Sequence, residues 1–247
     1  MKFVKLFKSK MFQFTLMVGL LITSALIILA MLLGNESGNF VFQVQEGEID
    51  KSISITDDLE SGLLTNRLIA EGQKNWVDTT VTHFLGDNYQ EQYTTLQTLT
   101  STGGRNVLFD SEQQGYVYAY TFYIVNTGAG LMELEIEMKM SNITKGMDNA
   151  IRVLTFNENE ANVNIYQKAD QQEVLYPGYY LKRPTNFIDG NTVYKEDVFL
   201  QSTGDNINNK NYLKYSVLVW LEGHDPECVN DIMGGTIKFA VNIRVKN

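Results

Sequence analysis

The clearest pattern in the chain is a strict alternation of apolar and charged residues between positions 132 and 140. Even-numbered positions carry methionine, leucine or isoleucine, whereas odd-numbered positions carry glutamate or lysine. A period of two residues is typical of a β-strand that packs one face on a core and turns the other to water. Residues 236–245 alternate in the same way, so we predict two strands with one buried and one solvated face.

Two other segments are apolar on both faces. Residues 116–125 and 213–221 are rich in tyrosine, valine and leucine, which indicates strands in the centre of a sheet. Residues 126–130 lead from the first of them to the alternating strand, and their glycines supply the positive φ angles that a hairpin loop needs. We therefore predict a hairpin at 126–130, and we expect residues 213–221 to pair with 236–245.

The rest of the sequence after residue 35 also has a strand-like composition, with short apolar runs between turn residues. Predicted strands lie at residues 40–44, 52–55 and 193–200, and a hairpin joins residues 151–156 to 163–166. Residues 59–70 and 90–99 fit short helices or strands equally well. The fold class that this pattern predicts is an all-β antiparallel β-sandwich, of jelly-roll or immunoglobulin-like type.

The N-terminus differs in character from everything that follows. Residues 1–10 contain four lysines and no acid, and residues 11–34 contain no charge. As a helix, this apolar run reaches roughly 35 Å, enough to cross a bilayer core of about 30 Å. It is longer than the core of a signal peptide and lacks a clear small-x-small cleavage site, so an uncleaved anchor is favoured over a cleaved signal.

Orientation follows from the lysines, because positive flanks stay in the cytoplasm. We therefore expect a single-pass plasma-membrane protein with residues 1–10 as a cytoplasmic tail. Residues 11–34 would be the transmembrane signal-anchor helix, which contacts the lipid bilayer, and residues 35–247 an extracellular β-sandwich domain.

Charge and cysteine content narrow the function classes. The exported part has 20 − 4 = 16 basic and 29 acidic residues, a net charge near −13. This balance argues against binding to nucleic acid or to an anionic lipid surface. The single Cys228 has no cysteine to pair with, so stability depends on the hydrophobic core. A single cysteine such as Cys228 is most often a small buried residue.

One segment near the C-terminus gathers reactive residue types, namely His224, Asp225, Glu227 and Cys228. Zinc sites take ligands in pairs from two separate elements, and no partner pair occurs here. A turn that begins at Asp225-Pro226 explains the composition better. A Cys–His enzyme is disfavoured, because His83 and His224 are the only histidines. The sequence assigns no catalytic, cofactor-binding or metal-binding residue.

Oxygen-rich loops and aromatic residues are the remaining candidates. Calcium could bind at residues 157–160, 189–191 or 205–209, although asparagine, aspartate and glycine usually cap their own backbone in such loops. Exposed aromatics could stack on a glycan or anchor a protein partner, and the candidates are Trp76, Tyr89, Tyr93 and residues 176–180. Trp220 lies in an apolar strand and is predicted to be core.

Three blocks carry a resemblance: residues 118–128 (YAYTFYIVNTG), Ile151-Arg-Val, and residues 215–235, which contain WLEGHDPEC. Over roughly residues 70–245 the chain resembles an uncharacterised family from low-GC Gram-positive bacteria. Its members have one N-terminal hydrophobic segment and an exported β-rich domain. A more distant likeness, in architecture, is to the TasA and camelysin surface proteins, small β-sandwiches that build extracellular fibres. The resemblance implies location and fold and supplies no site residues.

Three function hypotheses follow from the sequence. The leading one is a non-enzymatic binding or assembly module at the cell surface, with a surface protein or glycan as its partner. The second is a structural subunit of an extracellular fibre or matrix. The third is a cell-envelope hydrolase, which would need two facing carboxylates in a cleft.

Overall fold

The computed structural model describes residues 40–45, 52–72, 76–109, 115–128, 130–157, 162–169, 184–201 and 211–246. These residues belong to one compact unit, Gly38–Asn247. Within the described ranges, no helix is both long and apolar enough to span a membrane. The predicted tail and anchor, residues 1–34, lie outside the described residues.

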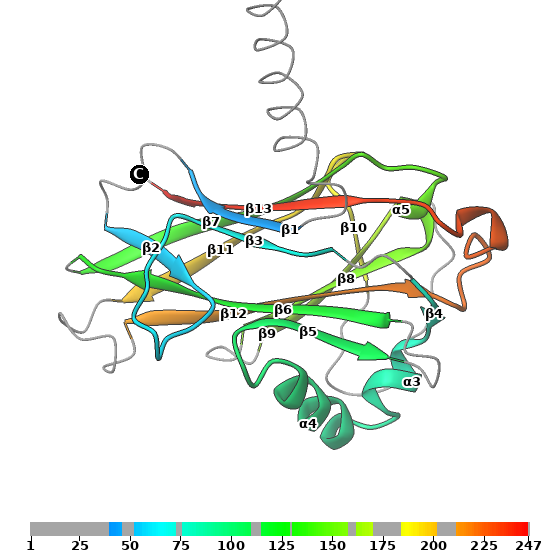
Figure 1. The fold of residues 1–247 in the computed structure, drawn as a ribbon, viewed down its shortest axis with the longest axis horizontal. Coiled ribbons are helices and arrows are strands. Elements are labelled where there is room, and N and C mark those ends of the chain that lie inside the picture. The colour runs from blue at the N-terminus through cyan, green and yellow to red at the C-terminus, as the bar shows by residue number, and fades with distance from the viewer. Residues whose placement is uncertain are drawn as a thin grey trace, which may run out of the picture. The chain divides into compact units, whose positions relative to one another are not determined.

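Two β-sheets pack face to face, so the β-sandwich is confirmed (Figure 1). The first, sheet A, has the spatial order β11, β7, β13, β1, β3. Its strands are β1 (Phe40–Val44), β3 (Arg67–Ala70), β7 (Leu131–Ser141), β11 (Thr192–Gln201) and β13 (Lys238–Val245). Neighbouring strands are antiparallel except β1 and β13, which run parallel with Phe42 opposite Val241.

The second sheet, sheet B, has the order β10, β9, β8, β12, β6, β2, with β4 beside β12 and β5 beside β6. Its strands are β2 (Ile53–Thr56), β4 (Asp78–Thr79), β5 (Gly104–Phe109), β6 (Gly115–Asn126), β8 (Ile151–Asn157), β9 (Asn162–Gln167), β10 (Thr185–Asn186) and β12 (Tyr212–Glu222). The predicted hairpin of 151–156 with 163–166 is confirmed, because β8 and β9 pair antiparallel.

Two helices add a third layer on the outer face of sheet B (Figure 1). They are α3 (Val81–Leu85) and α4 (Tyr89–Leu99), and both begin at a capping side chain. Asn88 caps α4 by accepting a hydrogen bond from the Glu91 N–H at 3.1 Å. Of the two ambiguous segments, residues 90–99 are therefore helical, whereas residues 59–70 contain strand β3. A short helix, α5 (Met147–Ala150), precedes β8.

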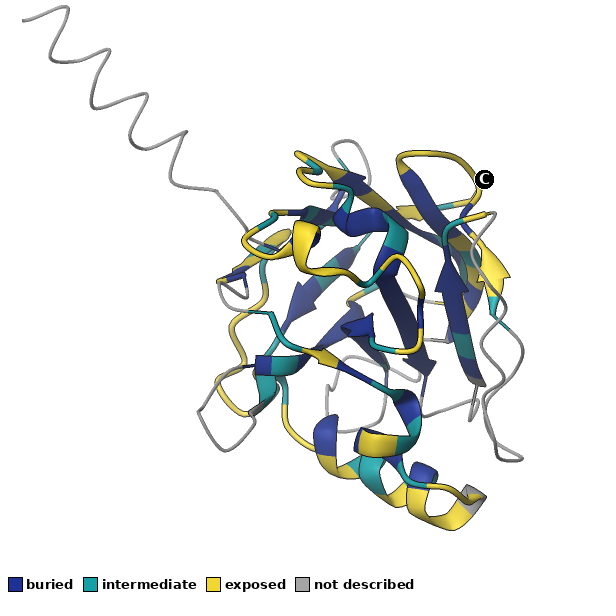
Figure 2. Ribbon diagram, turned by 90° about the vertical axis from the view of Figure 1, so that its right-hand side faces the viewer, coloured by how far each residue is buried: buried dark blue, intermediate teal, exposed yellow. Residues whose placement is uncertain are grey.

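The three layers enclose two hydrophobic cores. Between the sheets, rings from opposite strands stack, with Phe40 on Tyr118 at 4.2 Å and Phe42 on Tyr120 at 4.4 Å between ring centroids. Between sheet B and the helices, Trp220 is fully buried and meets the ring of Phe84 edge to face at 5.2 Å. The prediction that Trp220 is core is confirmed. Figure 2 shows the buried strands, with the helices exposing only their outer side.

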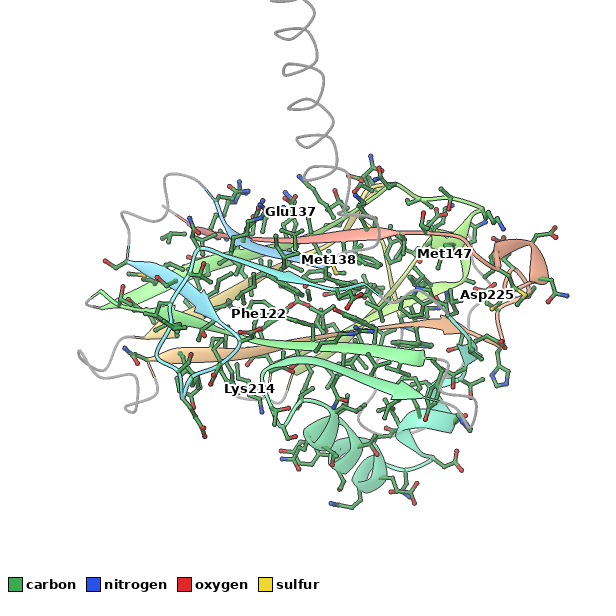
Figure 3. The ribbon with its side chains drawn as sticks, viewed as in Figure 1. Phe122, Glu137, Met138, Met147, Lys214 and Asp225 are labelled. Atoms are coloured by element: carbon green, nitrogen blue, oxygen red, sulfur yellow. The ribbon has the colours of Figure 1, made fainter. Side chains whose placement is uncertain are left out.

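The predicted strand patterns are confirmed, and their cause is the layer arrangement. In β7, Leu134, Ile136 and Met138 have no exposed surface, and Glu137 lies on the opposite face of the strand from Met138 (Figure 3). On this outer face, burial opposes ionisation of Glu137, but hydrogen bonds from Lys195 and Lys139 lower its pKa. Strands β6 and β12 are apolar on both faces because sheet B is covered on both sides.

Two predicted pairings are wrong. Strand β6 lies in sheet B and β7 in sheet A, so residues 126–130 connect the two sheets and form no hairpin. Gly130 does adopt a positive φ of 96°. Strands β12 and β13 likewise belong to different sheets. The physical reason is that β6 and β12 are apolar on both faces and need cover on both, whereas β7 and β13 have one polar face. The chain therefore passes from one sheet to the other between β6 and β7 and again between β12 and β13.

Candidate functional site

The segment after β12 folds over one end of the sandwich. Strand β12 ends at Glu222, and the Gly223 N–H donates to the Thr79 carbonyl of β4 at 2.8 Å. A Cβ atom on Gly223 would lie 2.9 Å from Asp78 Oδ2, so glycine permits this close approach. A turn follows, closed by the Cys228 N–H bound to the Asp225 carbonyl at 2.9 Å. The predicted turn at Asp225-Pro226 is therefore confirmed.

A buried ion pair holds this turn against the sandwich. Arg152 Nη2 lies 2.7 Å from Asp225 Oδ2, and neither side chain has exposed surface. Arg152 Nη1 also donates to the Ile151 carbonyl at 3.1 Å, and the second Asp225 oxygen accepts from the Glu227 N–H at 2.8 Å. Because isolated charges are very unfavourable in a protein interior, each ion fixes the position of the other.

Glu222 is a second fully buried acid at this end. Its carboxylate accepts hydrogen bonds from Trp220 Nε1 at 3.0 Å and from the His224 N–H at 3.3 Å. The His224 imidazole is exposed, with Nδ1 4.0 Å from Glu222 Oε1. The carboxylates of Glu222 and Asp225 and the guanidinium of Arg152 are thus all buried beside the turn.

The turn and the 3₁₀ helix that follows it (Asn230–Ile232) close one side of a pocket of about 200 Å³. Met147 and Asp225 both lie at this end of the sandwich (Figure 3). Most of the lining residues have apolar side chains, although the lining surface is as much polar as apolar: Trp76, Val77, Asp78, Met147, Leu221, Cys228, Val229, Asn230, Ile232, Met233, Gly234 and Gly235. Asp78 is the one ionisable carboxylate among these residues.

The mouth of the pocket is apolar as well. Val229 and Met233 are 50% and 65% exposed, although both also line the cavity. Exposed apolar side chains around a concave site are a common mark of a binding surface. Lys145 reaches the same edge, where its Nζ donates to the Met233 carbonyl at 2.5 Å.

Cys228 is half-buried in the pocket wall, and its pKa is raised to about 11. Burial is the largest cause, and the charges of Asp78, Asp225 and Glu222 act in the same direction, opposed by Arg152. The thiol is therefore protonated at neutral pH and is a poor nucleophile.

The other predicted candidates are not brought together. In the described part of the chain, no three histidine, cysteine, aspartate or glutamate side chains are placed to hold a metal ion. His83 is exposed and packs against the ring of Tyr116. Asp189 accepts hydrogen bonds from the N–H groups of Asn191 and Thr192, which lower its pKa and cap its own loop. Residues 158–160 and 205–209 lie outside the described residues.

The aromatic candidates separate in the same way. Trp76 is half-buried and lines the pocket, whereas Tyr93 is half-buried and packs against the core under the helices. The side chain of Tyr89 and residues 176–180 are outside the described part of the molecule. Sequence reasoning missed Asp78, Met147 and Met233. They come from three separate segments and carry no motif, so their proximity is a product of the fold.

A second polar cluster lies where the two sheets meet at β11. Glu196 of sheet A accepts hydrogen bonds from Thr155 at 2.8 Å, Asn164 at 3.0 Å, Tyr215 at 2.5 Å and also from Tyr166, all in sheet B. Burial, reinforced by the Glu196 charge, raises the pKa of both tyrosines well above the ordinary value. The phenols stay neutral, so the cluster joins the sheets and offers no activated nucleophile.

Comparison with protein-family models, with curated proteins and with solved structures finds no match for this chain. The pocket at the end of the sandwich is therefore assigned from its own geometry.

Proposed function

We propose that this protein is a non-enzymatic binding module tethered at the cell surface, and that the end pocket is its recognition site. The observation that carries the proposal is a cavity of about 200 Å³ lined by apolar side chains and polar groups, with the exposed side chains of Val229 and Met233 in its lining. A rigid concave site with an apolar rim is suited to taking one side chain of a partner. The buried Arg152–Asp225 pair supports this role, because it holds the pocket wall in place.

The chemistry of the pocket favours binding over catalysis. Glycoside hydrolysis needs two carboxyl groups about 5–9.5 Å apart across the scissile bond. The described lining contributes Asp78 alone, and the Cys228 thiol is protonated at neutral pH because its pKa is raised to about 11. These two facts support a module that captures a partner without transforming it.

The tether belongs to the same proposal. Residues 11–34 would span the plasma membrane, with residues 1–10 in the cytoplasm and residues 35–247 outside. The support is the charge-free run of 24 residues after a lysine-rich start. We retain the jelly-roll or immunoglobulin-like class as a proposal for the finer topology of the sandwich.

Crosslinking on intact cells tests this function. A photo-activated amino acid at position 233 should capture a surface partner, because Met233 borders the pocket. The same amino acid at position 63 is the matched control, since Leu63 is 75% exposed and does not line the pocket. A partner captured at 233 and not at 63 supports the proposal. Equal capture at both positions, or capture at neither, contradicts it.

A second candidate, the fibre subunit, is favoured by one observation. Strand β11 is the outermost described strand of sheet A, and Phe199 and Leu131 expose 57% and 65% of their surface beside that edge. Open edges of this kind can pair with another chain. Intact mass of the mature protein separates the two candidates, because a subunit released from the membrane should lack about 30 N-terminal residues.

A further inference from the structure

The pocket combines apolar side chains with nearby carboxylates, and this combination specifies the chemistry of its ligand. Leu221, Ile232 and Met147 provide walls that match a chain of methylene groups. Trp76 adds an aromatic ring, which attracts cations through its π-face. A neutral apolar ligand would use the walls alone, whereas an ammonium ion on an aliphatic stem would use both features.

The charges around the pocket favour a cation. Asp78 is an exposed residue of the lining, and within the described part of the chain no residue donates a hydrogen bond to its side chain or forms an ion pair with it. Glu222 and Asp225 lie behind the wall, and Arg152 is already committed to Asp225. The other nearby cation, Lys145, is committed to the Met233 carbonyl at the rim.

The charges that act on Cys228 are also those that would act on a ligand in the pocket. Its thiol is part of the lining, and after burial the causes that raise its pKa are the charges of Asp78, Asp225 and Glu222. Lys145 is not among the charges that act on it. Burial, the largest of these causes, disfavours any charge at this place, whereas the carboxylates of Asp78, Asp225 and Glu222 favour a positive one.

We propose that the pocket binds the protonated side chain of a lysine on a protein partner, with its methylene stem between Leu221 and Ile232 and its ammonium group near Asp78. A lysine side chain is preferred to a free amine because Val229 and Met233 extend the apolar surface beyond the cavity, where the partner's backbone can lie. This inference rests on the proposed role of the pocket as the recognition site.

The test uses the full chain in lipid nanodiscs, with ¹³C-labelled methionine methyl groups as reporters. Met147 and Met233 line the pocket, and Met138 is the internal control because it is fully buried between the sheets. The probes are a blocked Gly-Lys-Gly tripeptide, its norleucine analogue, which has the same stem without the ammonium group, and n-butylammonium.

We expect the lysine tripeptide to shift the Met147 and Met233 signals saturably and to leave Met138 unchanged. The norleucine tripeptide should bind about tenfold more weakly, because it loses the electrostatic contribution. n-Butylammonium should also bind more weakly, because it lacks the backbone. Equal binding of the lysine and norleucine peptides would overturn the inference, and equal binding of n-butylammonium would assign the pocket to a free amine instead.

Two variants test whether the Asp78 carboxylate is the group that attracts the ammonium ion. Asp78→Asn should weaken the lysine tripeptide roughly two- to fivefold and leave the norleucine tripeptide unchanged. Asp231→Asn is the matched control, because Asp231 is an exposed aspartate between the lining residues Asn230 and Ile232 and is not itself part of the lining. Equal effects of the two variants would overturn the role of Asp78. If norleucine binds as well as lysine while Met233 still captures a partner on cells, the ligand assignment fails and the binding function stands.

Discussion

The Arg152–Asp225 ion pair allows a quantitative test of how the pocket wall is held. The two charged atoms lie 2.7 Å apart, and both side chains are fully buried. Asp225→Asn preserves the shape of the side chain and removes its charge. The guanidinium of Arg152 then remains in the interior opposite a neutral amide.

The expected loss is large because the remaining charge has no compensation. Removing one partner of a buried ion pair costs about 3–5 kcal/mol of folding free energy. For a domain of this size, each 1 kcal/mol lowers Tm by about 2–4 °C. We therefore expect Asp225→Asn to lower Tm by roughly 6–20 °C.

Asp197→Asn is the matched control. Asp197 pairs with Lys246 at the same distance, 2.7 Å, but the two side chains are 50% and 35% exposed. Solvent screens that pair, so its loss should leave Tm close to that of the parent protein. Thermal unfolding followed by tryptophan fluorescence measures both variants, because Trp220 is buried in the core and becomes exposed on unfolding.

Equal falls in Tm for the two variants would refute the reasoning, since the two pairs have the same separation and differ strongly in burial. A further variant, Arg152→Met with Asp225→Leu, removes both charges at once. It should recover most of the lost stability, because replacing both partners leaves neither ion of the pair buried without the other. A double variant as unstable as Asp225→Asn would show that the pair is needed for its hydrogen bonds and not for charge compensation.

Three further predictions use the same unfolding measurements or simple chemistry. Glu196→Gln should destabilise the protein by about 2–3 kcal/mol, because a neutral amide then replaces a carboxylate that accepts hydrogen bonds from four side chains. Glu133→Gln, on the outer face, should have little effect. Burial raises the pKa of Tyr194 and Tyr215, so the folded state keeps protons that the unfolded chain releases. Stability should therefore be complete below about pH 10 and fall above it, and urea midpoints that stay constant from pH 8 to 11 would contradict this. Because the pKa of Cys228 is about 11, its alkylation by iodoacetamide in the folded protein should accelerate about tenfold per pH unit between pH 8 and 10. In urea, the alkylation rate of the unfolded chain should instead level off above the ordinary thiol pKa of about 8.5.

The strands were predictable because burial determines their pattern directly. Alternation in β7 reflects one face on the core and one in water, and this is visible without knowledge of any partner strand. The continuous apolar pattern of β6 and β12 correctly indicated strands covered on both faces. The second cover, formed by α3 and α4, was not predicted, because α4 (YQEQYTTLQTL) is rich in glutamine and threonine and has only a narrow apolar face.

Strand pairing was less predictable because it depends on the layers. The short connection at residues 126–130 was interpreted as a hairpin, yet the change from a doubly apolar to an alternating strand across it was a sign that the chain changes sheets. The pocket was beyond sequence reasoning altogether. Trp76, Met147 and Met233 are far apart in sequence, and only the packing of β4, α5 and the segment after β12 brings them together.

The parallel pairing of β1 with β13 has a consequence for how the protein is made. The first described strand is completed by the last, with Phe40 opposite Phe239, and β13 also separates β1 from β7. A ribosome that has synthesised everything before Lys238 has produced two halves of sheet A with no strand to join them. The sandwich can therefore close only after β13 has been synthesised, and a stop codon at position 238 should prevent the whole domain from folding.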